Sequence, residues 1–336
     1  MALVQKQFNA FYDKIRLVDS DEGAQLRQKR KVLLDALAEG LRRQSDEHGL
    51  PALSYRSVNQ GSYALGTGIV PKDGNYDIDV GLLFDHETTE FDQPVTLKKR
   101  VRDALASGPR SVRIRRPCVT VEYKRAGTVE YHVDLAVYAN GADGMQRLAI
   151  GREHSANDEQ DWLDSDPLGF LDAVRQKYTA KVEDHRFRRA IRFMKKWRNH
   201  CFPEGKPPSV AATLLAYHHF GQVGREVEEF DIQALSAMVA RILGTGQRIS
   251  APLPVRPYTD VLATMTDNQA DAFRAKLVAL KETLDEAIDH ESTQHACKLL
   301  AGVFGPDFPI PDNPEEGAKK SDGKRRAPYV TTGHSA

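Results

Sequence analysis

The sequence is poor in cysteine, tryptophan and methionine, with 3 Cys, 2 Trp and 5 Met among 336 residues. Cys118, Cys201 and Cys297 lie far apart and show none of the short spacings that zinc ligands require. This scarcity argues against a zinc site. It is typical of a protein that works in the reducing cytosol rather than one held together by disulfides.

The sequence also lacks a long apolar run and an excess of charge of either sign. No apolar run approaches the roughly 20 residues that cross a bilayer, and the first residues lack the layout of a signal peptide. We therefore expect a soluble, cytoplasmic protein with no membrane partner. The 47 Lys and Arg residues balance 47 Asp and Glu residues. A zero net charge argues against a protein that follows long nucleic acid by bulk electrostatic attraction.

The length favours two lobes, because 336 residues exceed what one core usually holds. We predict an α+β fold in which residues 1–157 form a mixed α/β lobe with a long N-terminal helix, and residues 158–305 form a helical lobe. Residues 306–336 are rich in proline, charge and small side chains. Such a composition cannot bury a core, so we expect a flexible C-terminal tail.

The most informative stretch is an acidic strand. Apolar side chains alternate with other residues at Ile78, Val80, Leu82 and Phe84, which is the period of a strand with one face in a core. Asp77 and Asp79 then share the opposite face. Two carboxylates so close together repel each other unless a cation lies between them, and Mg²⁺ prefers such oxygen ligands.

A third carboxylate and a glycine-serine turn complete the pattern. Asp134 lies in another alternating stretch, residues 129–138, on the face away from the apolar side chains. If the two strands are neighbours, three carboxylates converge and can hold two Mg²⁺ or Mn²⁺ ions. At Gly61 and Ser62, a backbone without a β-carbon and a hydroxyl group could bind phosphate oxygens.

These motifs carry a family resemblance. Residues 60–67 and 76–82, followed by a lone Asp on a later strand, resemble the DNA polymerase β-type nucleotidyltransferases and, among them, the cGAS/DncV-like enzymes. The resemblance implies a two-lobed fold with a mixed-sheet lobe and a helical lobe. It implies an enzyme that joins ATP, GTP or other nucleoside triphosphates into a cyclic di- or trinucleotide signal in anti-phage defence. It also implies a role for each matching residue: Asp77, Asp79 and Asp134 as catalytic metal ligands, and Gly61 and Ser62 as phosphate-binding residues.

A basic segment in the predicted helical lobe supplies candidate cations. Residues 185–198 contain seven Arg and Lys residues and no acid. On an arbitrary protein, such a helix would usually present a solvated basic face. The resemblance implies contact with the triphosphate through Lys195, with Lys196 as its rival. It also implies a second phosphate-binding serine at Ser209, for which a plain helix cap is the alternative.

Other functions remain open. The same superfamily includes synthases of linear products and terminal tRNA nucleotidyltransferases, as well as enzymes that adenylylate a drug or a protein. A catalytically idle nucleotide sensor is a third class, although a binding module has no need of three carboxylates. The end of the chain, residues 331–336, resembles tails that a ubiquitin-transfer-like enzyme conjugates to other proteins. A frayed terminus would explain that end equally well.

Overall fold

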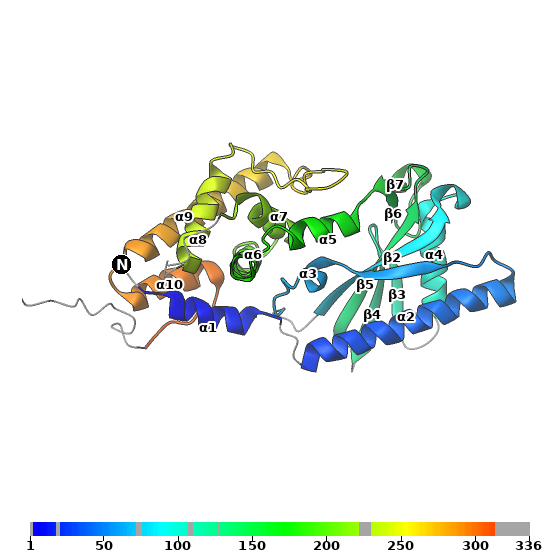
Figure 1. Cartoon of the computed structure of the whole chain (residues 1–336), viewed down its shortest axis with the longest axis horizontal. Helices are drawn as coiled ribbons and strands as arrows, with labels where there is room; N and C mark the ends of the chain where they lie inside the picture. Colours follow the sequence, from blue (N-terminus) through cyan, green and yellow to red (C-terminus); the bar gives the residue numbers. More distant parts are fainter. Residues whose placement is uncertain are drawn as a thin grey trace, which may run out of the picture.

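A computed structural model describes residues 3–17, 21–71, 76–106, 110–125, 128–221 and 230–312. Within these ranges, the side chains of residues 21–27, 76–77, 124–125 and 128–130 are not described. The molecule has two lobes side by side, one built on a β-sheet and one built of helices (Figure 1). The predicted two-lobed α+β architecture is confirmed.

One mixed sheet of seven strands forms the first lobe within the described residues. The strands are β1 (Tyr55–Asn59), β2 (Tyr76–Glu87), β3 (Ser111–Ile114), β4 (Val119–Arg125), β5 (Thr128–Asn140), β6 (Gln146–Ile150) and β7 (Asp161–Asp164). Their order is β1-β2-β5-β4-β3, with β6 added to β5 and β7 added to β6. Only β2 and β5 run parallel to each other among these pairs, and the other pairs are antiparallel.

The core of this lobe follows from the alternation in its central strands. The apolar set of β2 and the apolar side chains of β5 point to one face, where they are fully buried: Ile78, Val80, Leu82, Phe84, Val133, Leu135 and Val137. Two helices pack against this face, α2 (Asp21–His48) and α4 (Pro94–Leu105), as Figure 1 shows. The helix α4 begins with proline in its first turn, where the missing N–H costs nothing.

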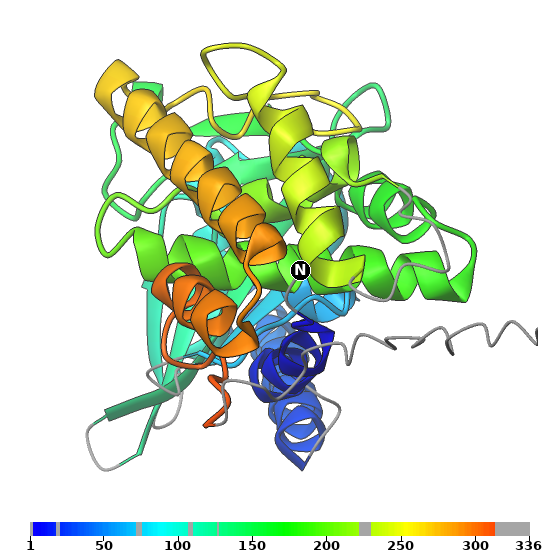
Figure 2. The same cartoon turned by 90° about the vertical axis from the view of Figure 1, so that its left-hand side faces the viewer.

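The second lobe packs helices around an apolar core. Its helices are α5 (Pro167–Arg175), α6 (Lys181–Cys201), α7 (Ser209–His219), α8 (Phe230–Leu243), α9 (Asp267–Asp289) and α10 (Thr293–Phe304). In Figure 2, which faces this lobe, α9 and α8 cross in front of α6. Trp197 and Phe193 of α6 are among the most deeply buried side chains of this core.

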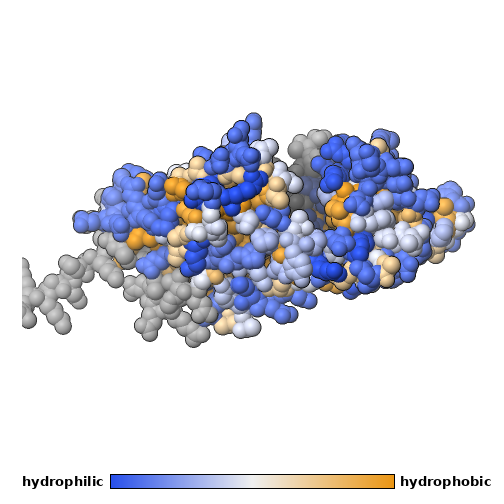
Figure 3. Space-filling view, turned by 90° about the horizontal axis from the view of Figure 1, so that it is seen from above, coloured by the Kyte–Doolittle hydropathy of each residue, from blue (hydrophilic) through white to orange (hydrophobic). Residues whose placement is uncertain are grey.

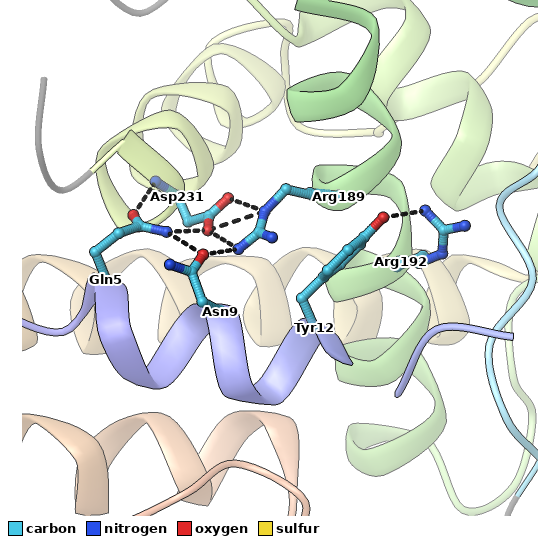
Figure 4. A network of polar contacts seen from close by, with 6 residues as sticks. All are labelled: Gln5, Asn9, Tyr12, Arg189, Arg192 and Asp231. Atoms are coloured by element: carbon cyan, nitrogen blue, oxygen red, sulfur yellow. Dashed lines mark hydrogen bonds and ion pairs between the residues drawn. The ribbon is translucent and has the colours of Figure 1, made fainter. Parts of the chain in front are cut away.

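The N-terminal helix α1 (Gln5–Ile15) also belongs to the helical lobe, although residues 1–157 were predicted as one lobe. Phe8 and Phe11 are fully buried against the helical core, in ring contact with Phe193. A polar network reinforces this packing (Figure 4). The buried Arg189 donates to Asp231 at 3.0 Å and to Asn9 at 2.8 Å. The N-terminal segment therefore serves both lobes, α1 in one and α2 in the other.

Two other boundaries differ from the sequence-based prediction. Residues 158–164, predicted as the start of the helical lobe, contain β7, which extends the sheet through β6. At the other end, the tail was predicted to begin at residue 306, yet Phe308 is buried in the helical core. Asp307 forms ion pairs with Lys196 and Lys14. The predicted conjugation site at the end of the chain lies outside the described residues.

Within the described ranges, no helix has both the length and the apolar composition needed to cross a bilayer.

Candidate functional site

Two of the three predicted acids are direct neighbours in the sheet. Asp79 of β2 is the register partner of Asp134 in the parallel strand β5. Partners in adjacent strands lie about 4.8 Å apart along the hydrogen-bonding direction and point to the same face. That face is opposite the buried face of Ile78 and Val133. Two half-buried carboxylates therefore lie side by side, as the alternation of both strands predicted.

The backbone of Asp77 pairs with His132, two residues along the same two strands from the Asp79–Asp134 pair. Residues 77 and 79 are two apart in one strand, so both occupy the same face. The Asp77 side chain lies outside the described side chains. Among the side chains that are described, no three His, Cys, Asp or Glu residues form a metal-binding group.

The glycine-serine turn closes directly over Asp79. Gly61 begins the short helix α3 (Gly61–Ala64) with a positive φ of 59°, which favours glycine. A β-carbon at this position would lie 1.8 Å from an Asp79 carboxylate oxygen. The backbone of Gln60 donates to the Asp79 carbonyl at 2.9 Å. The predicted turn and the acidic strand therefore meet, and only glycine permits the approach.

Asp134 is held by a residue that the sequence analysis did not select. The Thr120 hydroxyl donates to an Asp134 carboxylate oxygen at 2.5 Å. Thr120 lies in β4, where it is the register partner of Asp134, and it is fully buried. Cys118 lies behind it, with the sulfur 3.5 Å from the Thr120 hydroxyl. Burial, with the nearby Asp134 charge, raises the pKa of the Cys118 thiol to about 12, so this thiol remains protonated.

Cations of the helical lobe hold the loop that follows the turn. Arg188 donates to the Leu65 carbonyl, and Arg192 donates to the Gly66 and Gly68 carbonyls at 2.5 and 3.1 Å. Arg175 of α5 reaches the Ala64 carbonyl in the same loop at 2.9 Å. These contacts fix the position of the turn relative to α6, since they join the two lobes at this point.

Lys195 completes this series. Its ammonium group is buried and lies 3.2 Å from the Thr67 carbonyl and 3.3 Å from the Thr67 hydroxyl. Burial lowers the pKa of Lys195 to about 7, and the Arg192 charge adds to this effect, whereas Asp79 opposes it. The charge of Asp79 in the acidic strand therefore affects the pKa of Lys195, and the ammonium group faces the loop that follows Ser62.

Lys196, the rival candidate, faces elsewhere. Its ammonium group pairs with Asp307 at 2.5 Å, beside α1. The alternative of a solvated basic face on α6 is wrong, because Arg189, Arg192, Lys195 and Lys196 are each at most 7% exposed. The basic run instead supplies buried contacts on several sides of the helix.

Ser209 is exposed and is the first residue of α7, directly after Pro208. Its neighbour Val210 lines a cavity of about 390 Å³, together with Gly61 of the glycine-serine turn. This volume lies in the range of roughly 300 to 1,000 Å³ that small-molecule sites usually have. Figure 3, a view from above, shows the hollow between the two lobes. Gly61 therefore borders this cavity, whereas Ser209 is only next in sequence to a residue that lines it.

The walls of this cavity are mostly apolar, with five polar or charged side chains. The apolar wall includes Leu148, Phe170, Leu171, Val210, Leu253 and Val255. Tyr138 and Gln60 are hydrogen-bonded to each other at 3.1 Å, and Asp166 accepts from the Gly169 backbone at 2.8 Å. Ser165 and the exposed Arg256 complete the lining. A flat apolar ligand with a polar edge would suit this space.

Comparison with known proteins shows a similarity in the sheet lobe. Residues 56–138 match the family model described as the nucleotidyltransferase domain of cyclic GMP-AMP synthase DncV-like proteins. These residues are similar to a DncV-like nucleotidyltransferase domain. The match contains the acidic pair and the glycine-serine turn, so the predicted resemblance to the cGAS/DncV-like family is confirmed.

Solved structures extend the similarity to both lobes. A structure of DncV from Vibrio cholerae in complex with the linear intermediate pppA(3′,5′)pG is 18% identical to this chain, with a TM-score of 0.69. The match covers 90% of this chain and 97% of that one. The apo form of the same protein gives 16% identity and a TM-score of 0.69, covering 90% and 96% of the chains. This chain therefore has the DncV-like fold throughout both lobes.

Proposed function

We propose that this protein is a divalent-metal-dependent nucleotidyltransferase that joins nucleoside triphosphates into a cyclic di- or trinucleotide and releases pyrophosphate. The observation that carries the proposal is the pairing of Asp79 with Asp134 directly beneath Gly61. The DncV-like domain match supports the reaction class. The Vibrio cholerae DncV structures contain GTP in one case and a linear dinucleotide intermediate in another, which supports triphosphates as substrates.

The acidic pair fits a divalent ion. Asp79 and Asp134 offer carboxylate oxygens on one face, and Asp77 shares that face through its strand position. Such hard oxygen donors suit Mg²⁺ or Mn²⁺. When bound, two ions of this kind would stabilise the charge on the reacting phosphate and make the attacking hydroxyl more acidic. Asp77, Asp79 and Asp134 would hold them.

The remaining roles belong to side chains around the acids. Asp134 takes the proton of a ribose hydroxyl on the acceptor nucleotide, and the hydroxyl oxygen attacks the α-phosphate of the donor. The bond to the β-phosphate breaks, and pyrophosphate leaves with the electron pair. Ser62, Lys195 and Ser209 bind the departing phosphates, while Gly61 leaves room for them near the backbone. The arginine side chains that donate to the carbonyls of residues 64–68 keep this turn in place.

The cavity between the lobes would receive a nucleobase. Gly61 belongs both to the turn and to the cavity wall, so a nucleotide whose phosphates lie at the turn can direct its base into this space. The apolar wall, which includes Phe170, suits the faces of a base. A repeated transfer on the linear product, followed by ring closure, would yield the cyclic signal. We assign that signal to cytoplasmic anti-phage defence on the family resemblance.

The test is a product assay. Purified protein is incubated with all four nucleoside triphosphates and Mg²⁺ or Mn²⁺, then treated with phosphatase, and the surviving species are identified by mass. We expect a phosphatase-resistant cyclic product. Asp79→Asn with Asp134→Asn should abolish it, whereas Asp271→Asn, an exposed acid on α9, should leave it unchanged. A phosphatase-sensitive product would indicate a linear-product synthase, and incorporation that survives the double substitution would refute the site.

A further inference from the structure

We propose that Thr120 is a positioning residue that fixes the Asp134 carboxylate in the orientation needed to bind the divalent ion. The inference rests on the proposed function, because it assigns Asp134 to the metal. No feature of the sequence around Thr120 indicated this role. It follows from the pairing of two strands and from one short hydrogen bond.

The geometry of the contact is well defined. Thr120 and Asp134 are register partners in the antiparallel strands β4 and β5, so their side chains stand next to each other on one face. The hydroxyl oxygen lies 2.5 Å from one Asp134 carboxylate oxygen. An ionised carboxylate only accepts hydrogen bonds, so the hydroxyl must donate. This bond fixes the rotation of the carboxylate plane, which decides where its other oxygen points.

Burial makes the contact difficult to replace. Thr120 is 0% exposed, so a water molecule from bulk solvent has no direct access to its position. The β-branched side chain also has few rotamers, which holds the hydroxyl in place. On the far side, the Cys118 sulfur lies within 3.5 Å of the same hydroxyl. The Thr120 hydroxyl is therefore packed between the Cys118 thiol and the Asp134 carboxylate, and Asp134 is the carboxylate that it orients.

Side chains that hydrogen-bond to metal ligands commonly have a large effect on metal binding. Removing such a partner typically costs 10- to 100-fold in metal affinity or activity. A merely structural role for Thr120 predicts something different, namely a loss of stability with unchanged metal affinity in the molecules that remain folded. Metal binding without nucleotide separates the two roles.

The experiment measures Mn²⁺ binding to nucleotide-free protein by electron paramagnetic resonance of the free ion. We expect Thr120→Val, which keeps the shape but removes the donor, to weaken Mn²⁺ binding about 10-fold or more. Thr120→Ser keeps the donor and should stay within about 2-fold of the wild type, whereas Thr120→Ala should resemble Thr120→Val. Thr293→Val is the matched control, because Thr293 is fully buried in the helical lobe and its hydroxyl has no hydrogen-bond partner among the described residues.

The outcomes distinguish this inference from the proposed function. A folded Thr120→Val protein with wild-type Mn²⁺ affinity, alongside weakened binding in Asp134→Ala, would overturn the role of Thr120 alone. Unchanged Mn²⁺ binding in Asp134→Ala would instead remove the metal role of Asp134 and the proposed site with it. If Thr120→Val does not fold, the Ser and Ala variants, which differ by one oxygen atom, decide the question. Failure of both Val and Ala variants to fold would assign Thr120 a structural role and overturn the inference.

Discussion

Lys98 in the sheet lobe and Lys195 in the helical lobe are both buried, but their ammonium groups have different surroundings. Lys98 of α4 donates to three backbone carbonyls, those of Arg115, Arg116 and Gly151, at 2.6, 2.9 and 2.7 Å. Lys195 has two longer contacts, at 3.2 and 3.3 Å, and both come from Thr67. Burial lowers the pKa of Lys98 to about 8 and that of Lys195 to about 7.

The difference separates a structural lysine from a candidate ligand. An ammonium group has three N–H donors, and the three carbonyls around Lys98 use all of them. The contacts of Lys195 are weaker, and its site also feels the opposing charge of Asp79. We infer that Lys98 joins three segments of the sheet lobe. Lys195, in contrast, can gain a stronger partner when an anion binds at the glycine-serine turn.

The largest expected effect is on catalysis, from Lys195→Met. The substitution removes the buried cation that faces the turn, so we expect kcat/KM for nucleoside triphosphates to fall by about 10²- to 10³-fold. Incorporation of labelled nucleotide measures it. Lys196→Met is the control, because that lysine pairs with Asp307 away from the turn. An equal fall of kcat/KM in both variants would show that the position of the lysine along the basic helix does not matter.

Lys98→Met should act on stability instead. It removes a donor from three backbone carbonyls, of which that of Arg116 still accepts from the Gly151 N–H, so we expect the free energy of unfolding to fall by about 3 kcal/mol. Urea denaturation followed by circular dichroism measures this change. The folded fraction should keep wild-type kcat/KM. A Lys98→Met protein that is stable but inactive would reverse the assignments of the two lysines.

The pH dependence of binding gives a finer comparison. Lys195, with its pKa near 7, is mostly neutral in the free protein at pH 8. A bound triphosphate favours the ammonium form and raises this pKa, so binding at pH 8 should take up close to one proton. Affinity should therefore fall as the pH rises above about 7.

Titration calorimetry in buffers with different ionisation enthalpies measures this proton uptake. We expect the uptake to disappear in Lys195→Met and to persist in Lys98→Met, because the carbonyls around Lys98 do not change when nucleotide binds. Persistence of the uptake in Lys195→Met would place the titrating group elsewhere.

The smallest expected effect concerns an exposed cation. Arg256 lines the cavity and has no hydrogen bond or ion pair to the described residues. A guanidinium group matches the two acceptors on the edge of guanine, whereas adenine presents a donor there. Arg256→Ala should weaken GTP binding about 5-fold and leave ATP binding unchanged. The loss for GTP is about 1 kcal/mol, at the low end for such contacts. Fluorescence titration with both nucleotides tests this, and equal weakening would indicate contact with phosphate instead.

Sequence patterns predicted the local part of the site. Alternation in β2 and β5 placed Asp79 and Asp134 on the polar faces of their strands, and the strand pairing puts them side by side. Residues 185–198 were placed in the predicted helical lobe, and they lie in α6. These features depend on neighbours within one element, which a single sequence records.

Features that depend on pairing between distant segments were missed. Thr120 lies in β4, and only the register of β4 against β5 reveals its partner. The apolar stripe of α1 fits either lobe equally well, so its place beside Phe193 could not be inferred. Phe308 was assigned to the tail because the prolines around it obscured a single buried ring.

The parallel pairing of β2 with β5 has a consequence for how the protein matures during synthesis. Between these strands the ribosome must make α4, β3 and β4, and Lys195 follows only with α6. A nascent chain that ends before α6 would carry both acids but lack the cations that secure the turn. We expect such fragments to be catalytically silent, so the proposed nucleotidyl transfer would begin only after the second lobe emerges.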